Sequence, residues 1–246
     1  QHALGLALDS IALGATDVVI TGGSESCVCP CGIGGFNAMK ALSTRNDDPA
    51  TASRPFSASR DGFVLGEGAG VFVFESLERA KARGAKIYAE VLGFGMTDDA
   101  NHIAAPLADG SLAAKAMQGA VAQSGRSLED VNYVNAHGTS TPLNDVMETR
   151  AIRTVFGDHA DRLMVSSTKS QVGHCLGASG AVELVAISMG IEQGVIPATI
   201  NSNDPDPECD LDYVPNEPRQ EQIEVSISNS FGFGGHNACL CVGRFR

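Results

Sequence analysis

The chain has 246 residues, of which 43% are hydrophobic and 19% charged, the balance of a globular protein rather than a disordered one. Its 17 basic and 29 acidic residues leave a formal net charge of −12, which argues against a nucleic-acid-binding surface. No apolar run approaches the roughly 18–20 residues that a membrane-spanning helix needs, and no signal peptide is visible.

Apolar residues recur at helical spacing in some stretches and form short continuous runs, typical of buried strands, in others. In chain order these patterns predict a helix over 4–11, strands over 17–21 and 69–75, a helix over 77–83, a strand over 88–94, a helix over 112–121, a strand over 131–136, a helix over 144–156, a strand over 163–166, a helix over 176–191, and paired strands over 223–228 and 238–242. The stretch 24–61 loses this periodicity and is expected to be mostly loop. Strands that alternate with helices argue for an α/β fold with buried sheets.

Small and polar residues mark the ends of several predicted helices. Ser76 and Ser111 can accept hydrogen bonds from the first turns that follow them, so both are predicted N-caps. Gly14 and Gly84 lie where the preceding helices would end, a position that favours glycine because it adopts a left-handed conformation without strain. No linker rich in proline or serine separates two cores.

The sequence contains seven cysteines: Cys27, Cys29, Cys31, Cys175, Cys209, Cys239 and Cys241. An odd number without a secretion signal favours free thiols in a reducing compartment, so we expect a cytoplasmic location. Three of the cysteines form C-V-C-P-C, but this spacing is not C-x2-C, and no second ligand pair lies at zinc spacing. We therefore interpret the cluster as small residues in a tightly packed loop and expect no metal site.

Three segments share one design, in which a hydrophobic strand runs into a polar turn that carries reactive side chains. They are V-N-A-H-G-T-S-T-P over 134–142, S-S-T-K-S-Q-V-G-H over 166–174 and N-S-F-G-F-G-G-H-N over 229–237. Proteins of the α/β class place ligands at the carboxyl ends of strands. These three turns are therefore the leading candidates for a functional site.

The side chains of these turns suit stabilisation of a negatively charged oxygen. A neutral imidazole, such as that of His137 or His174, can donate one hydrogen bond, and two such donors on one oxygen would stabilise an enolate or oxyanion. The ammonium group of Lys169 beside them would lower the histidine pKa by like-charge repulsion. The hydroxyls of Thr139 and Thr141 suit an amide-rich or phosphate-bearing arm.

Each of these signals is weak when taken alone. A single histidine after a strand is more often structural than catalytic, and a single lysine is more often a solvated surface charge. The glycine-rich turn could equally be a simple hairpin, because it lacks the helix-opening context of a nucleotide-binding loop. The other histidines, His2, His102, His159 and His236, receive the structural interpretation.

Taken together, the motifs resemble those of the β-ketoacyl-acyl carrier protein synthases, or ketosynthases, the condensing enzymes of fatty-acid and polyketide synthesis. Besides the three turns, A-L-S-T-R-N-D-D-P over 41–49 and R-D-G-F-V-L-G-E-G-A-G over 60–70 match this family. The resemblance runs from the first predicted helix to the last strand and is strongest to the stand-alone elongating synthases of the dissociated, bacterial-type pathway. It implies the thiolase-like layered αβαβα fold.

The resemblance also implies an acyltransferase that works by decarboxylative Claisen condensation. An acyl group moves from a carrier-protein thioester to an active-site cysteine; malonyl-carrier protein then loses CO2, and the resulting carbanion attacks the acyl-enzyme. By motif, His137 and His174 would bind the malonyl thioester carbonyl and promote decarboxylation, and Lys169 would orient and tune them. Phe233 resembles the gate phenylalanine, whose backbone N–H joins the oxyanion hole.

Four further positions match the family with supporting roles. Thr139 and Thr141 would contact the phosphopantetheine arm, and Glu183 matches a buried acidic residue that supports the histidines and lysine. Arg45 matches a basic residue implicated in docking the acidic carrier protein. His236 departs from the pattern, because many members have threonine there, which leaves the shape of the pantetheine side open.

The family nucleophile is absent from the residues given. It belongs to an alanine-cysteine-x-serine-glycine elbow just before the helix that here starts at Gln1, and none of the seven cysteines has that context. Cys175 follows His174 but is expected to be a core residue. We therefore expect the nucleophile upstream of Gln1, so that the chain lacks much of the first thiolase half. Residues 1–84 would end the N-terminal half, and 85–246 would form the C-terminal half.

Two other interpretations stay open at this point. The chain could be a non-catalytic partner like the chain-length factors, although those usually lose the histidine motifs that this chain keeps. A biosynthetic thiolase is disfavoured, because those enzymes use other histidine and cysteine motifs. The resemblance implies no cofactor other than the phosphopantetheine arm of acyl carrier protein, and it implies a homodimer or a ketosynthase heterodimer.

Overall fold

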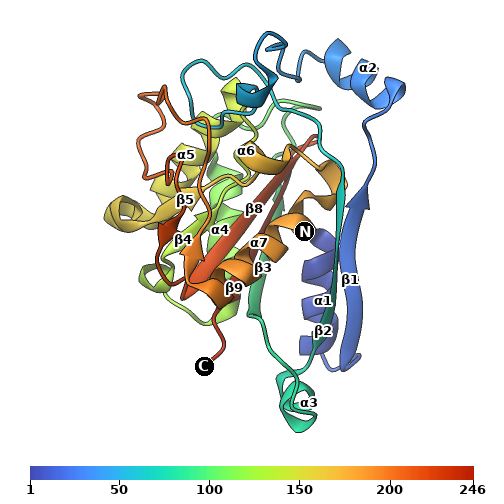
Figure 1. The fold of residues 1–246 in the computed structure, drawn as a ribbon. Helices are drawn as coiled ribbons and strands as arrows, with labels where there is room; N and C mark the ends of the chain where they lie inside the picture. The colour runs from blue at the N-terminus through green and yellow to red at the C-terminus, as the bar shows by residue number, and fades with distance from the viewer.

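The computed structural model describes residues 1–246 as an α/β structure (Figure 1). The helices are α1 (His2–Ala12), α2 (Pro30–Ala38), α3 (Leu77–Ala82), α4 (Ser111–Ser124), α5 (Pro142–Phe156), α6 (Lys169–Val172) and α7 (Ser179–Gln193). The strands are β1 (Val18–Glu25), β2 (Gly68–Glu75), β3 (Glu90–Asp98), β4 (Tyr133–Asn135), β5 (Met164–Ser166), β6 (Val195–Ile196), β7 (Arg219–Gln220), β8 (Val225–Gly232) and β9 (His236–Gly243). No helix combines the length and the apolar character needed to cross a bilayer.

Five strands form the main sheet, in the order β3-β9-β8-β4-β5. β8 and β9 are an antiparallel hairpin, and β9 also pairs antiparallel with β3. β4 is parallel to both of its neighbours, with Asn135 opposite Ser166 of β5 and Ser228 of β8. The carboxyl ends of β4, β5 and β8 therefore meet at one edge of the sheet, the usual place for a ligand in such a fold.

Helices cover both faces of this sheet. α4 and α5 share one core with the inward side chains Val134, Val165 and Ile227, while their neighbours in the strands point to the other face, because side chains alternate along a strand. On that other face, α1 and α7 pack between the main sheet and the separate antiparallel pair β1–β2 (Figure 1). The order of layers is thus two helices, the five-stranded sheet, two helices and the two-stranded sheet.

Glycines allow α4 to approach β3 closely. A Cβ atom at Gly95 would lie 2.0 Å from the carbonyl oxygen of Ala116, and one at Gly93 would lie 2.1 Å from that of Ala120. Real Cβ contacts are never this short, so larger residues at these positions would push the helix away from the sheet. This packing fixes where the loop between β3 and α4 leaves the sheet, and that loop forms part of the cavity described below.

Most predicted elements are present within a few residues, and two predicted element ends were wrong. Residues 24–61 are mostly loop, as predicted, but α2 lies within them; this helix was missed because none of its residues is buried and it carries no apolar period. β1 does not end at residue 21 as predicted, since β2 pairs with it as far as Glu25. Ser111 is the first residue of α4 rather than its N-cap, a position that Gly110 occupies in the left-handed conformation.

The other helix ends are close to prediction. Gly14 and Gly84 follow α1 and α3 with φ values of +71° and +64°. Ser76 takes the N-cap position of α3, but its hydroxyl makes no capping hydrogen bond. The Ser76 side chain therefore stabilises the start of α3 less than a serine at the N-cap was expected to.

The C-V-C-P-C cluster lies at the start of α2, and its interpretation as a tightly packed loop was wrong. Cys29 and Cys31 are exposed and Cys27 is half-buried. No group of three or more histidine, cysteine, aspartate or glutamate side chains is arranged to hold a metal ion. Cys175, in contrast, is buried, as expected of a core residue.

Candidate active site

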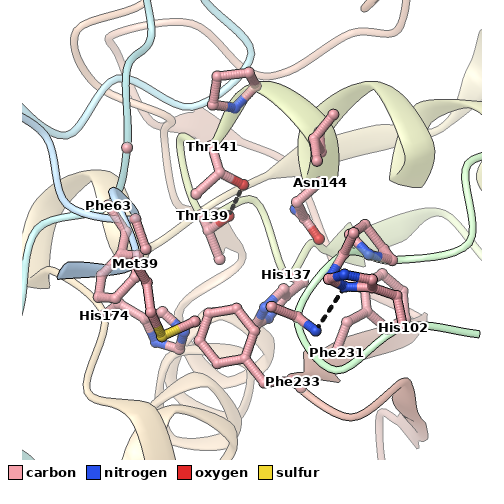
Figure 2. A pocket seen from close by; sticks show the side chains of 18 of the residues that line it. Met39, Phe63, His102, His137, Thr139, Thr141, Asn144, His174, Phe231 and Phe233 are labelled. Atoms are coloured by element: carbon pink, nitrogen blue, oxygen red, sulfur yellow. Dashed lines mark hydrogen bonds between the residues drawn. The ribbon is translucent and has the colours of Figure 1, made fainter. Parts of the chain in front are cut away.

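A cavity of about 600 Å³ opens at the sheet edge where β4, β5 and β8 end (Figure 2). Its walls come from six stretches of the chain: 39–41, 61–63, the loop 99–106, the turn 137–144, residues 174–176 and the hairpin turn 231–237. Five of the expected site residues line it: His137, Thr139, Thr141, His174 and Phe233. The parallel strands bring these side chains together. The sequence had shown only that they belong to turns of similar design.

His137 follows β4 and is fixed through its backbone. Its N–H donates to one carboxylate oxygen of Glu148 on α5, and the Gly138 N–H donates to the other, both at 2.8 Å. The side-chain amide of Asn229 on β8 donates to the same carboxylate at 2.9 Å. Glu148 thus joins the turn after β4 to the neighbouring strand β8. The Nδ1 atom of His137 is buried without a hydrogen-bond partner.

His174 lies beside His137, with the ring centroids 5.4 Å apart and the planes nearly perpendicular. Its Nδ1 accepts a hydrogen bond from the Leu176 N–H at 3.1 Å and lies 2.9 Å from the Ser179 hydroxyl. A nitrogen that accepts a hydrogen bond carries no proton, so the proton of the neutral ring is on Nε2. His174 can therefore donate from Nε2.

Lys169 forms a buried ion pair with Glu183 of α7, and both side chains are only 2% exposed. Burial raises the pKa of the Glu183 carboxyl, while the charge of Lys169 opposes this. The second carboxylate oxygen of Glu183 has no hydrogen-bond partner. The pair holds a cation close enough to both histidines to act on their titration.

The pKa values of His137 and His174 both lie well below the ordinary value of 6.5. Burial is the largest cause for each ring, and the positive charge of Lys169 adds to it. The sequence predicted the lysine effect but not the larger effect of burial. Both rings are therefore neutral near pH 7, the state in which each can donate one hydrogen bond and accept another.

Phe233 lies at the tip of the β8–β9 hairpin and is 45% exposed. Its ring stacks near Phe36 of α2, with centroids 6.2 Å apart, and its backbone N–H has no acceptor in the structure. Phe36 in turn meets Phe63 edge-on, and Phe63 meets the ring of His174 at 5.1 Å. A row of aromatic rings thus connects the hairpin tip to the histidine pair.

Thr139 and Thr141 share a hydrogen bond of 2.8 Å between their hydroxyls on the cavity wall (Figure 2). The buried guanidinium of Arg60 holds this turn by donating to the Thr141 carbonyl at 3.1 Å and the Pro142 carbonyl at 2.9 Å. Asp206 pairs with the same guanidinium at 2.6 Å. The turn is therefore held in place from a side that the substrate would not touch.

Four of the positions considered from the sequence do not line the cavity: Lys169, Glu183, Arg45 and His236. Arg45 is half-buried in the loop after α2 and does not line the cavity, whereas the exposed Lys40 lies on its rim. His236 pairs with Asp98, with 3.2 Å between Nδ1 and a carboxylate oxygen. His102, interpreted from sequence as structural, does line the cavity.

Glu148 is the main residue of this site that the sequence did not single out. It lies four residues before Ile152 on α5 and hence on the same, buried face of the helix. A carboxylate on a helix face that also carries Ile152 and Val155 is a signal that could have been noticed, because buried charges need partners. Burial raises the pKa of Glu148 to about 7, although the three N–H donors act in the opposite direction.

The comparisons with known proteins agree with the motifs. Residues 1–80 match the model of the family described as "Beta-ketoacyl synthase, N-terminal domain", and residues 88–203 match "Beta-ketoacyl synthase, C-terminal domain". The chain belongs to the β-ketoacyl synthase family.

Curated and solved β-ketoacyl synthases resemble the chain over its whole length. A 3-oxoacyl-[acyl-carrier-protein] synthase 2 of Synechocystis sp. (strain ATCC 27184 / PCC 6803 / Kazusa) is 52% identical over 246 residues, which are 100% of this chain and 59% of that protein. The structure described as "AntDE:AntF (apo): type II PKS acyl-carrier protein in complex with its ketosynthase bound to the hexaketide" has a TM-score of 0.98 and 41% identity, with 100% of this chain and 60% of that chain covered. "The ishigamide ketosynthase/chain length factor" has a TM-score of 0.93 and 39% identity, with 100% and 58% covered.

The chain therefore spans about 60% of the length of the β-ketoacyl synthases it matches. Its fold is that of these thiolase-like enzymes, and the two-stranded sheet β1–β2 lies on the side of the N-terminal match. The site residues identified above all lie within the matched length.

Removal of the Lys169 charge is expected to shift the pH dependence of the histidine pair. We expect the double variant Lys169→Met/Glu183→Gln, which avoids leaving a buried carboxylate, to raise the pKa of both imidazoles, since like charge no longer opposes protonation. When the pH is lowered, any activity that needs neutral rings would then be lost at a higher pH in the double variant than in the wild type. The measurement is the pH profile of the whole protein's activity between about pH 5 and pH 8.

The single variant Lys169→Arg is the matched control, because it keeps a positive charge beside Glu183 and is expected to leave the acid limb unchanged. An acid limb that is identical in the wild type and the double variant would show that Lys169 does not tune the pair.

Proposed function

We propose that the whole protein is a β-ketoacyl-acyl carrier protein synthase that condenses an acyl thioester with malonyl-acyl carrier protein. The observation that carries the proposal is the convergence of two neutral imidazoles, at 5.4 Å between ring centroids, with a free backbone N–H at Phe233 around one cavity. Such a set of donors suits an oxygen on which negative charge develops. The names of the relatives support the same reaction class.

The reaction divides into steps that the residues can serve. In decarboxylation, the bond between the malonyl carboxylate and the α-carbon breaks, CO2 leaves, and the electron pair moves onto the thioester as an enolate. His174 Nε2–H and an imidazole N–H of His137 would donate to that enolate oxygen. Both rings are neutral, so each has one N–H group to donate. The α-carbon then attacks the acyl thioester, a C–C bond forms, and the cysteine thiolate leaves.

The oxygen of the attacked acyl group would be stabilised separately. The unpartnered N–H of Phe233 at the hairpin tip is the donor we assign to it. The exposed position of the ring lets it move without disturbing the core. Thr139 and Thr141, held by Arg60, would hydrogen-bond to the phosphopantetheine arm, and Glu183 would hold Lys169 in place.

The acyl-accepting cysteine is proposed to lie in a segment of the whole protein that precedes Gln1. No cysteine lines the cavity. Cys175 is adjacent to His174, but it is buried, and burial raises the pKa of its thiol, which makes it a poor nucleophile. The relatives are longer than this chain, which leaves room for such a segment. We further propose that residues 1–84 and 85–246 belong to the two thiolase-like halves.

The alternative function is that of a non-catalytic, chain-length-factor-like partner in a ketosynthase heterodimer. A ketosynthase paired with a chain length factor is among the similar structures, and this observation supports the alternative. The intact pair His137 and His174 favours the catalytic role, because a partner that performs no decarboxylation does not need it. A glutamine or another residue in place of the upstream cysteine would favour the partner role.

The test is to incubate the whole protein with acyl- and malonyl-acyl carrier protein and follow three signals. Mass spectrometry should show an acyl group on a cysteine upstream of Gln1, CO2 should be released, and the chain should grow by two carbons. Absence of all three signals would refute the proposal. Activity that appears only with a second subunit would favour the heterodimeric partner. Homodimer and heterodimer are distinguished in the same sample by light scattering.

Docking of the carrier protein is proposed to use basic side chains beside the cavity mouth. Neither Arg45 nor Lys40 has a carboxylate partner within the chain, so both are free to meet an acidic protein. We expect Arg45→Glu to raise KM for acyl-acyl carrier protein about tenfold, or about 1.4 kcal/mol, because juxtaposed like charges are costly at an interface. Lys40→Glu, on the rim itself, should have an effect at least as large.

The measurement is KM for carrier-protein substrates against KM for acyl-pantetheine, which lacks the protein. Only the former should change, and the unfolding temperature should stay constant. Arg126→Glu, at the far end of α4, serves as the control charge reversal. An unchanged KM for Arg45→Glu beside a raised KM for Lys40→Glu would move the docking site from Arg45 to Lys40.

A further inference from the structure

His102 lies in the loop between β3 and α4 and lines the wall of the cavity formed by that loop (Figure 2). Its Nδ1 accepts two hydrogen bonds from backbone N–H groups of its own loop, from Ala104 at 3.0 Å and from Ala105 at 2.9 Å. An accepting nitrogen carries no proton, so the proton of the neutral ring is on Nε2. The backbone therefore fixes both the ring and its tautomer.

The loop that carries His102 is bound to the hairpin turn that carries Phe233. The Asp99 N–H donates to the Gly235 carbonyl, and the Gly234 N–H donates to the Ile103 carbonyl, both at 2.8 Å. The Asn237 amide donates to one Asp99 carboxylate oxygen at 2.7 Å, and the Leu107 N–H donates to the other at 2.9 Å. These four bonds hold His102 at a fixed place relative to the cavity.

Nearby polar side chains of the cavity satisfy one another. Thr139 pairs with Thr141, the Asn144 amide donates to Asp145, and the Asn237 amide donates to Asp99. His102 is an exposed residue, and its Nε2 has no hydrogen-bond partner within the chain. It is thus a donor that is oriented by the loop and left without an acceptor.

We infer that His102 Nε2–H donates a hydrogen bond to an amide carbonyl of the pantetheine arm; this rests on the proposed function. The ring is neutral in this tautomer and lies among Ala104, Ala105 and Pro106, surroundings that suit an amide rather than a phosphate. Figure 2 shows His102 on the opposite side of the pocket from His174, where the thioester would lie. His102 is therefore a substrate-positioning residue on the wall across from Thr139 and Thr141.

Two variants separate the donor from the loop-fixing acceptor. His102→Asn places a carbonyl oxygen near the position of Nδ1 and removes the donor, whereas His102→Gln places an N–H near Nε2 and removes the acceptor. The substrate is malonyl-pantetheine, which lacks the phosphate and the carrier protein. We expect His102→Asn to raise KM about 3- to 10-fold, the range for one lost hydrogen bond, with kcat within about twofold.

His102→Gln is expected to recover part of this loss. An unchanged KM in His102→Asn, or a higher KM in His102→Gln than in His102→Asn, would overturn the inference. So would a KM effect confined to carrier-protein substrates, which would indicate a contact with the phosphate or the protein. A fall in kcat as large as the rise in KM would point to a displaced loop and would also count against it. Failure of the wild type to decarboxylate malonyl-pantetheine would instead count against the proposed function.

Discussion

Alanine at His137 or His174 of the whole protein is expected to slow malonyl decarboxylation and condensation by about 10²–10³-fold. Each substitution removes one of two imidazoles that lie 5.4 Å apart on the same cavity. The loss is expected in kcat, because the enolate charge that these groups stabilise exists only after the C–C bond begins to break. CO2 release from malonyl-acyl carrier protein measures it directly.

Formation of the acyl-enzyme separates this role from general damage to the site. We assign the acyl oxygen to the Phe233 N–H rather than to the histidines, so acyl transfer to the cysteine should persist in both variants. His159→Ala is the matched control; this ring contacts the Val131 carbonyl away from the cavity and should leave decarboxylation unchanged. Near-normal condensation by His137→Ala or His174→Ala would rule out the assigned mechanism.

Glutamine at Glu148 is expected to impair the site without touching substrate. Three donors, the N–H groups of His137 and Gly138 and the Asn229 amide, converge on this carboxylate. A glutamine offers one acceptor oxygen and places an NH2 group against a backbone N–H, so one buried donor loses its partner. The free energy of unfolding should fall by about 1–3 kcal/mol, and a displacement of His137 by about 1 Å could lower kcat roughly 10²-fold.

Urea unfolding and the decarboxylation assay measure the two effects of Glu148→Gln. Glu129→Gln, at an exposed position, makes the same chemical change and should alter neither. A positioning role further requires that KM for malonyl-acyl carrier protein changes much less than kcat. If Glu148→Gln lost stability while kcat stayed normal, the carboxylate would be a purely structural link between α5 and β8.

Local physical chemistry decided what the sequence could predict. The apolar runs of β4, β5 and β8 and the helical spacing of α4, α5 and α7 follow from burial, which leaves a periodic trace in the chain. α2 left no such trace, because none of its residues is buried in this structure. The reactive residue types also stood out in sequence, since His137, Lys169 and His174 each follow a strand within a polar turn.

The sequence by itself thus determined the α/β class, the family motifs and which histidines and lysine to consider. Only the tertiary structure decided that the two histidines share one cavity and that Lys169 lies buried against Glu183 near them, because that depends on β4 being parallel to both β5 and β8. It also decided the partnership of Glu148 with His137 and Asn229, and the place of His102 across the pocket. Such contacts join residues far apart in the chain, and a hydrogen bond between distant segments has no local pattern that a sequence could display.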